Sequence, residues 1–198
     1  MKNSKAYKLP EEIEEAIVAE SRSSYGLHTY VSLFSSAGVG CYGFKEEGFY
    51  CVATVELLEK RLKIQSYNNK CVYKSGYICG DMTTQETKDK VFAELEMWKK
   101  GFHVTDLDVL IATPPCQGMS FNSVGKRLQE IREGRKPKDD PRNRLIIPTL
   151  HIVKRLKPKW LLLENVQEMQ NTLIPNESGD YQNIIDYIKQ ELPDYVGG

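Results

Sequence analysis

The segment that determines the fold lies near the middle of the chain, where residues 108–120 read DVLIATPPCQGMS. The segment 107–112 predicts a short buried strand, and Pro114 and Pro115 follow it. Because proline lacks a backbone N–H and has a fixed φ, two prolines cannot continue a central strand. The chain must leave the sheet there. Cys116 then stands at the carboxyl edge, where open α/β sheets bind their ligands.

A thiol held on such a stiff turn has the position of a nucleophile. Free cysteine is also among the most buried residue types, so a packing role is equally compatible with this stretch alone. The choice between the two interpretations of Cys116 depends on the other segments of the chain.

Composition predicts an ordinary water-soluble globular protein. The chain has 198 residues, 40% of them hydrophobic and 27% charged, with a formal net charge of +0. That length suits one domain with a good core. No apolar run approaches the ~20 residues that span a bilayer, and no signal sequence opens the chain. The 5 cysteines include no Cys-x-x-Cys pair, which argues against a metal site and for a reducing cytoplasm.

Strands and helices alternate along the chain. This alternation predicts an α/β fold with a doubly wound, mostly parallel sheet. A helix at 10–20 precedes it, so we expect an N-terminal helix and linker over residues 1–28 and the main domain over 29–198. The predicted strands are 29–34, 50–56, 78–81, 107–112 and 160–163, and the later helices are 39–47, 57–67, 86–99, 144–156 and 183–190.

Ligand-type residues follow the first three predicted strands. The first runs into a turn with Gly38 and Gly40, which lets a ligand approach the backbone and the helix N-terminus. Glu56 ends the second strand, where nucleoside-binding folds place an acid for the ribose hydroxyls. Asp81 ends the third and is a candidate acceptor for an adenine amino group. Together they predict a nucleoside site.

Glu164 follows the apolar strand 160–163 and is expected at the same edge as Cys116. Desolvation there would raise its pKa and let it donate or share a proton. An alternative role is local: Glu164 or Asn165 would cap a helix over 166–170. The two roles are compatible.

The segment between Lys126 and Arg144 carries eight basic and four acidic residues. All but its last residue lies in the long irregular stretch 118–143, and loops of that length are usually functional or disordered. Its basic surplus suits contacts with phosphates, although a solvated loop face explains the charge equally well.

The ordered motifs LFSSAG (33–38), Glu56, GDM (80–82), PCQ (115–117) and ENV (164–166) resemble those of the cytosine-5 DNA methyltransferases. The resemblance implies a Rossmann-like S-adenosylmethionine-dependent methyltransferase fold acting on double-stranded DNA. Cys116 and Glu164 would be catalytic. The cofactor would be bound by Phe34, Gly38, Glu56, Leu57, Asp81, Met82 and Pro115, and the loop facing nucleic acid would include Gln117, Ser120, Lys126 and Arg127.

The resemblance also implies the chemistry. Cys116 would attack carbon 6 of a flipped cytosine while Glu164 protonates ring nitrogen 3, which makes carbon 5 an enamine nucleophile. Three positions depart from the family pattern: Ser32 replaces an acid, Ser36 a glycine, and Thr113 stands where glycine is common.

The family's later motifs and target-recognition domain are not found in this sequence. We therefore expect the catalytic half of a prokaryotic restriction–modification methyltransferase, which needs a second subunit or a further segment to recognise its target. The alternatives are a tRNA cytosine-5 methyltransferase and a non-catalytic cofactor-binding subunit.

Overall fold

The computed structural model describes residues 15, 17, 26–102, 104–115, 141–175 and 181–197. The chain divides into two compact units, one comprising Met1–Ala112 and Leu156–Leu162, the other Thr113–Arg155 and Leu163–Gly198. The predicted division into residues 1–28 and 29–198 stays a prediction. Of the predicted helix 10–20, the described Glu15 and Ile17 are helical, and Ile17 is buried.

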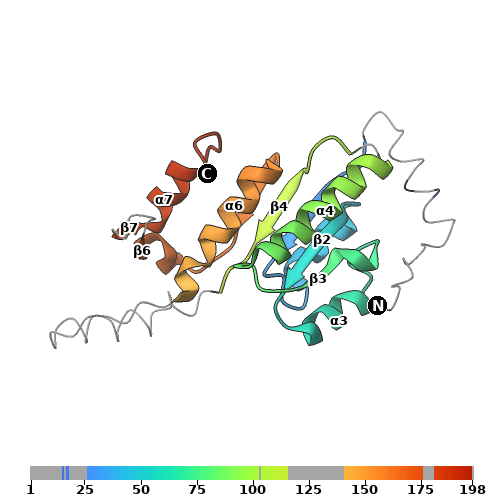
Figure 1. The fold of residues 1–198 in the computed structure, drawn as a ribbon, viewed down its shortest axis with the longest axis horizontal. Coiled ribbons are helices and arrows are strands. Elements are labelled where there is room, and N and C mark those ends of the chain that lie inside the picture. The colour runs from blue at the N-terminus through green and yellow to red at the C-terminus, as the bar shows by residue number, and fades with distance from the viewer. Residues whose placement is uncertain are drawn as a thin grey trace. The chain divides into compact units, whose positions relative to one another are not determined.

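A five-stranded sheet in the order β3-β2-β1-β4-β5 forms the centre of the first unit (Figure 1). Strand β1 pairs in parallel with β2 and β4, and β2 pairs in parallel with β3. This arrangement confirms the predicted Rossmann-like α/β class and its mostly parallel sheet. The strands are β1 Thr29–Leu33, β2 Tyr50–Glu56, β3 Tyr77–Cys79, β4 Val109–Ala112 and β5 Trp160–Leu163.

The register brings the carboxyl ends of the strands level. Leu33 on β1 lies opposite Val55 on β2 and opposite Ala112 on β4. Val55 in turn lies opposite Ile78 on β3. The segments that leave β1, β2 and β3 therefore begin at one edge of the sheet.

The helices of the first unit follow the predicted order with shifted ends. The predicted helix 39–47 is divided into a 3-10 turn and a short α-helix, since Gly40 and Gly43 weaken a continuous helix. The elements are η1 Val39–Cys41, α2 Tyr42–Glu46, α3 Glu59–Tyr67, η2 Lys74–Gly76 and α4 Gln85–Phe102.

Both faces of the sheet are covered. On β2, Tyr50 and its neighbour Cys51 point to opposite faces. The Tyr50 ring packs against Trp98 of α4 at 6.1 Å between centroids. On the other face Tyr30, opposite Cys51, packs against Phe44 of α2 at 5.5 Å. Burial on both faces explains why the strands read as nearly continuous apolar runs.

The second unit contains two α-helices close to the predicted ranges 144–156 and 183–190. It also contains a β-hairpin that the sequence did not predict. The hairpin pairs β6 Leu173–Pro175 in antiparallel fashion with β7 Tyr181–Asn183. Asn183 then caps the last helix, since its Oδ1 accepts from Ile185 N at 2.8 Å. The remaining elements are η3 Pro141–Leu145, α6 Ile146–Leu156, η4 Gln167–Asn171 and α7 Ile184–Glu191.

Among the residues that the structure describes, no helix is both long enough and apolar enough to cross a membrane.

Helix α4 buries one carboxylate. Glu94 is 9% exposed, and its Oε2 accepts a hydrogen bond from Ser75 Oγ at 3.2 Å. Burial raises the pKa of Glu94 above its ordinary value, and the Ser75 hydrogen bond offsets part of that rise. The folded protein therefore holds this proton more tightly than the unfolded chain does.

We expect Glu94→Gln to be more stable than the wild type at neutral pH. With a folded-state pKa above the unfolded one, Glu94 contributes stability at acid pH and loses it as pH rises beyond about 4.5. Glutamine has no charge to desolvate and still accepts from Ser75. Urea unfolding from pH 4 to pH 8 should show the advantage growing with pH.

The control is Glu96→Gln, the same change on an exposed face of α4, where Glu96 pairs with Lys99 at 3.7 Å. If both variants show the same pH dependence, the burial of Glu94 is not its cause.

Candidate active site

The loop after β1 has a left-handed backbone at three positions. The φ angles are 55° at Phe34, 49° at Ser36 and 86° at Gly38. Only Gly38 adopts this region freely, because it has no Cβ. A Cβ at Gly38 would also lie 3.0 Å from the Gln65 side chain. Ser36, where the sequence motif usually has glycine, must be held in this conformation by its surroundings.

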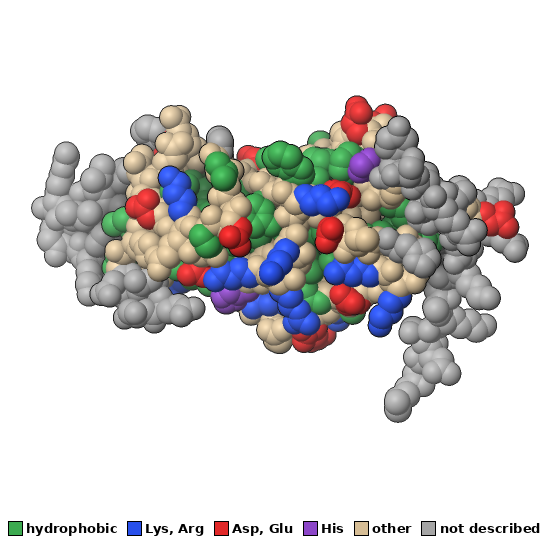
Figure 2. All heavy atoms as spheres, turned by 90° about the horizontal axis from the view of Figure 1, so that it is seen from above, with side chains coloured by type: hydrophobic (Ala, Val, Ile, Leu, Met, Phe, Trp, Pro, Cys, Tyr) green, Lys and Arg blue, Asp and Glu red, His purple; other side chains and the backbone are tan. Residues whose placement is uncertain are grey.

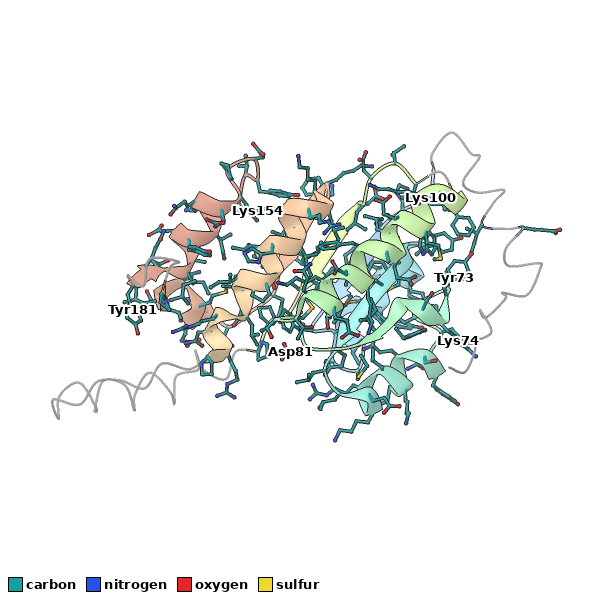
Figure 3. The ribbon with its side chains drawn as sticks, viewed as in Figure 1. Tyr73, Lys74, Asp81, Lys100, Lys154 and Tyr181 are labelled. Carbon is teal, nitrogen blue, oxygen red and sulfur yellow. The ribbon has the colours of Figure 1, made fainter. Side chains whose placement is uncertain are left out.

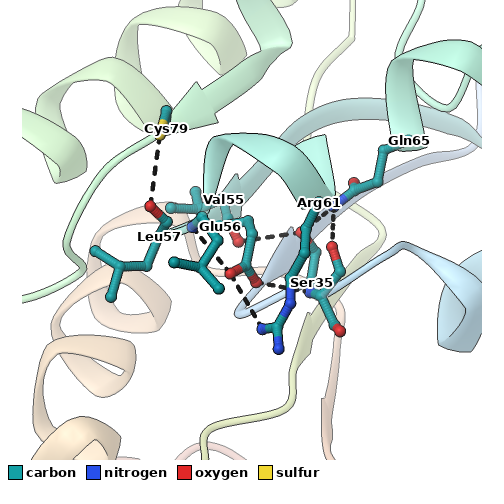
Figure 4. Close-up of polar contacts among 9 residues, drawn as sticks. Ser35, Val55, Glu56, Leu57, Arg61, Gln65 and Cys79 are labelled. Carbon is teal, nitrogen blue, oxygen red and sulfur yellow. Dashed lines mark hydrogen bonds and ion pairs between the residues drawn. The ribbon is translucent and has the colours of Figure 1, made fainter. Parts of the chain in front are cut away.

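Glu56 binds the loop to the end of β2. It is 5% exposed, and its Oε2 accepts from Ser36 N at 2.9 Å (Figure 4). Its Oε1 accepts from Leu58 N at 3.1 Å and pairs with Arg61 Nη1 at 3.3 Å. The carboxylate thus has a structural role that the sequence did not predict.

Gln65 of α3 holds the same loop from the other side. It is 1% exposed, and its Nε2 donates to Ser35 Oγ at 2.8 Å and to Ser36 O at 2.6 Å. Its Oε1 accepts from Thr54 Oγ1 at 2.7 Å. Gln65 was not predicted from the sequence. The available signal was a glutamine three positions after Leu62, on the buried side of a predicted helix.

The end of β3 joins the same network. Gly80 N donates to the Glu56 backbone oxygen at 3.1 Å, and a Cβ at Gly80 would lie 2.3 Å from Thr87 Oγ1. Asp81, labelled in Figure 3, is exposed, and its Oδ1 accepts from both the backbone N and Oγ1 of Thr83 at 2.8 Å. The carboxylate is therefore oriented by the turn that starts α4.

The two apolar residues predicted to contact a cofactor differ in exposure. Leu57 is 63% exposed directly after Glu56, whereas Met82 is 3% exposed. Leu57 offers an uncovered apolar surface beside the loop. Met82, the residue after Asp81, is buried in the protein.

The two prolines before Cys116 and the Glu164 segment meet in the second unit. Asn165 Nδ2 donates to Pro114 O at 3.2 Å, and Asn165 Oδ1 accepts from Val166 N at 2.8 Å. Pro115 is half-buried. Asn165 thereby connects the segment that leaves β5 with the segment that leaves β4.

Two expectations about this segment are wrong. Glu164 is exposed, so the described residues do not provide the desolvation expected at this carboxylate. Its side chain stays in solvent because it lies just beyond the edge strand β5, whose Trp160 and Leu162 are also exposed. Neither Glu164 nor Asn165 caps the next helix: η4 has Val166 as its N-cap, with no side-chain cap.

The remaining predicted residues lie outside the described part of the chain and stay predictions: Cys116, Gln117, Ser120, Lys126 and Arg127. On the face of the molecule in Figure 2, basic and acidic side chains are intermixed. Within the described ranges, no cluster of three or more His, Cys, Asp or Glu could hold a metal ion.

The structure therefore connects the predicted residues in two sets. Gly38, Glu56 and Asp81 belong to segments joined by hydrogen bonds at one edge of the sheet in the first unit, the segment of Asp81 through Gly80 N. Pro115 and Glu164 flank the Asn165–Pro114 hydrogen bond in the second unit.

The chain, including the motifs quoted above, matches a known protein family. The family model of the C-5 cytosine-specific DNA methylases matches residues 28–192. The chain is 35% identical over 137 residues to the Type II methyltransferase M1.HgaI of Avibacterium volantium, covering 69% of this chain and 34% of that protein. It is 28% identical over 175 residues to M.XorII of Xanthomonas oryzae, covering 83% and 36%.

A third relative is M.AquIA of Picosynechococcus, 33% identical over 141 residues, which cover 71% of this chain and 49% of that protein. The chain thus spans a third to a half of the length of these relatives. A crystal structure assigned as a prophage-encoded DNA modification methyltransferase of E. coli matches with a TM-score of 0.53 at 21% identity. It covers 84% of this chain and 38% of that one, and supports the fold.

We expect Glu56→Gln to lower the free energy of unfolding by roughly 1–3 kcal/mol, the usual cost of unpaired buried polar groups. A glutamine keeps one acceptor oxygen and points an NH₂ group at a backbone N–H, so either Ser36 N or Leu58 N loses its partner. Urea unfolding at pH 7 measures the change.

Glu59→Gln is the matched control, since Glu59 is an exposed residue paired with Lys63 at 3.1 Å. Exposed pairs of this kind contribute ~0.5 kcal/mol or less. Equal losses in the two variants would show that the Glu56 hydrogen bonds do not stabilise the loop.

Proposed function

The chain belongs to the C-5 cytosine-specific DNA methylase family, and from this premise we propose that it is the catalytic, cofactor-binding part of a DNA cytosine-5 methyltransferase. The observation that supports this most directly is the hydrogen bond from Asn165 to Pro114 O at 3.2 Å. It connects the segment that carries Glu164 with the turn that leads to Cys116. The two groups proposed to activate the cytosine ring, Cys116 and Glu164, thus each lie within two positions in sequence of a residue of this hydrogen bond.

S-adenosylmethionine is the proposed methyl donor, and the first unit offers groups that suit it. The Glu56 carboxylate accepts from three donors and has about four acceptor positions, so capacity remains for a ribose hydroxyl. Asp81 is exposed as a second acceptor, and Leu57 as an apolar surface. Phe34, Gly38 and Met82 complete the proposed set in the first unit. Pro115, which belongs to the second unit, is proposed from the family resemblance alone.

When bound, S-adenosylmethionine supplies a methyl group with electrophilic character. The protein's own part is to make carbon 5 of cytosine nucleophilic. The Cys116 thiolate adds to carbon 6 as Glu164 delivers a proton to nitrogen 3, so the ring becomes an enamine. After carbon 5 is methylated, a base removes the carbon 5 proton and the Cys116 thiolate leaves carbon 6. The nitrogen 3 proton returns to Glu164, which restores the aromatic ring.

Double-stranded DNA is the proposed substrate, with its target cytosine rotated out of the helix. The relatives named above are Type II methyltransferases, which supports a role in a restriction–modification system over the tRNA and non-catalytic alternatives. Because the chain spans only part of these relatives' length, we propose that a second chain or further segment recognises the target sequence.

We expect the chain, mixed with S-adenosylmethionine and duplex DNA that contains 5-fluorocytosine, to form a covalent adduct visible by denaturing electrophoresis. Fluorine at carbon 5 cannot leave as a proton does, so the Cys116 bond to carbon 6 persists. Cys116→Ser should form none of this adduct. Cys79→Ser, which changes an exposed cysteine at the end of β3, should form it normally.

An adduct that survives Cys116→Ser would remove Cys116 as the nucleophile. If the wild-type protein forms no adduct with duplexes that contain 5-fluorocytosine, alone or with a candidate partner chain, the proposed reaction is wrong.

A further inference from the structure

The peptide groups of the loop after β1 are held from two sides. Ser36 N donates to Glu56 Oε2 at 2.9 Å, while Ser36 O accepts from Gln65 Nε2 at 2.6 Å. Ser36 has a φ of 49°, a region that residues with a Cβ rarely adopt. Such a conformation persists only where the surrounding structure fixes it. Glu56 and Gln65 are the two side chains that do so here.

The hydrogen bonds of Gln65 fix the orientation of its side-chain amide. Both protons of its amide are donated to the loop, to Ser35 Oγ and Ser36 O. Its Oε1 accepts from Thr54 Oγ1, which in turn accepts from Lys70 Nζ at 3.0 Å. The Thr54 contact fixes which end of the amide faces the loop, so Gln65 presents its NH₂ group there.

The same side chain also sets the space at the glycine of the loop. Gln65 Cγ lies 3.0 Å, and Lys70 Cδ 3.3 Å, from the position of a Cβ at Gly38. Gln65 therefore controls the loop at Ser35, Ser36 and Gly38. Its own position is secured by burial to 1% exposure on α3.

We propose that Gln65 is a positioning residue that fixes the loop Ser35–Gly38 in its binding conformation before S-adenosylmethionine arrives. The part of this proposal that concerns cofactor rests on the proposed function. A loop that is already ordered loses less entropy on binding, so preorganisation raises affinity. No contact between Gln65 and the cofactor is needed.

The first test compares Gln65→Met with Lys63→Met. Methionine matches glutamine in length and donates nothing, whereas Lys63 is 73% exposed on the same helix. By calorimetry, we expect Gln65→Met to weaken S-adenosylmethionine binding roughly tenfold, the effect of one to two lost hydrogen bonds. Lys63→Met should bind like the wild type.

The second test uses Gln65→Glu and a pH series. A carboxylate at this position would point a lone pair at Ser36 O, whereas a carboxylic acid can donate to it. The charged groups that belong to the same hydrogen-bond network are Lys70, which donates to Thr54 Oγ1, and the Glu56–Arg61 pair, and all three are present in the wild type. Binding by Gln65→Glu, relative to wild type at the same pH, should recover from pH 8 to pH 5.5. A purely structural defect would not recover in this way.

Hydrogen–deuterium exchange of residues 34–41 without cofactor separates the two proposals. Faster exchange in Gln65→Met, with exchange elsewhere as in Lys63→Met, supports the positioning role whether or not the protein binds cofactor. Unchanged exchange, or unchanged affinity in a wild type that does bind, overturns it. If the wild type binds no S-adenosylmethionine, yet Gln65→Met exchanges faster over residues 34–41, the result counts against the proposed cofactor and leaves Gln65 as the residue that orders this loop.

Discussion

The hydrogen bond from Ser36 N to the buried Glu56 carboxylate is the contact on which one edge of the sheet depends, the edge at which β1, β2 and β3 end. Strand β1 ends in a loop with Phe34 and Ser36 in the left-handed region, which costs of order 1–3 kcal/mol per residue. The Glu56 side chain satisfies the Ser36 N–H, and its own backbone oxygen accepts from Gly80 N. One residue thus connects the ends of three neighbouring strands.

Glu56 therefore has two roles, one in the fold and one in the proposed binding of cofactor. A buried carboxylate is stable only when donors surround it, and Ser36 N, Leu58 N and Arg61 provide them. The residue proposed to accept a ribose hydroxyl is therefore also part of the fold. The Arg61 side chain is 44% exposed and the Glu56 side chain only 6%, so the positive partner of this pair is the one that reaches solvent.

The second unit shows how an amide side chain can connect two motifs far apart in sequence. Asn165 and Pro114 are 51 positions apart, and one hydrogen bond joins them. Pro114 cannot donate from its own nitrogen, so its carbonyl is the only backbone group through which it can be held. Glu164, next to Asn165, is exposed.

The sequence by itself determined the alternation of strands and helices, the parallel sheet and the ligand-type residues Gly38, Glu56 and Asp81 at strand ends. Strands buried on both faces read as apolar runs bounded by glycine and proline, so β2 and β5 match their predicted bounds. Only the tertiary structure decided the roles of Gln65 and Asn165, the hairpin of β6 and β7, and the exposure of Glu164. Gln65 and Ser35 are 30 positions apart, and three-residue strands carry no periodicity. Such features arise from contacts between distant segments, and no local pattern of residue types encodes them.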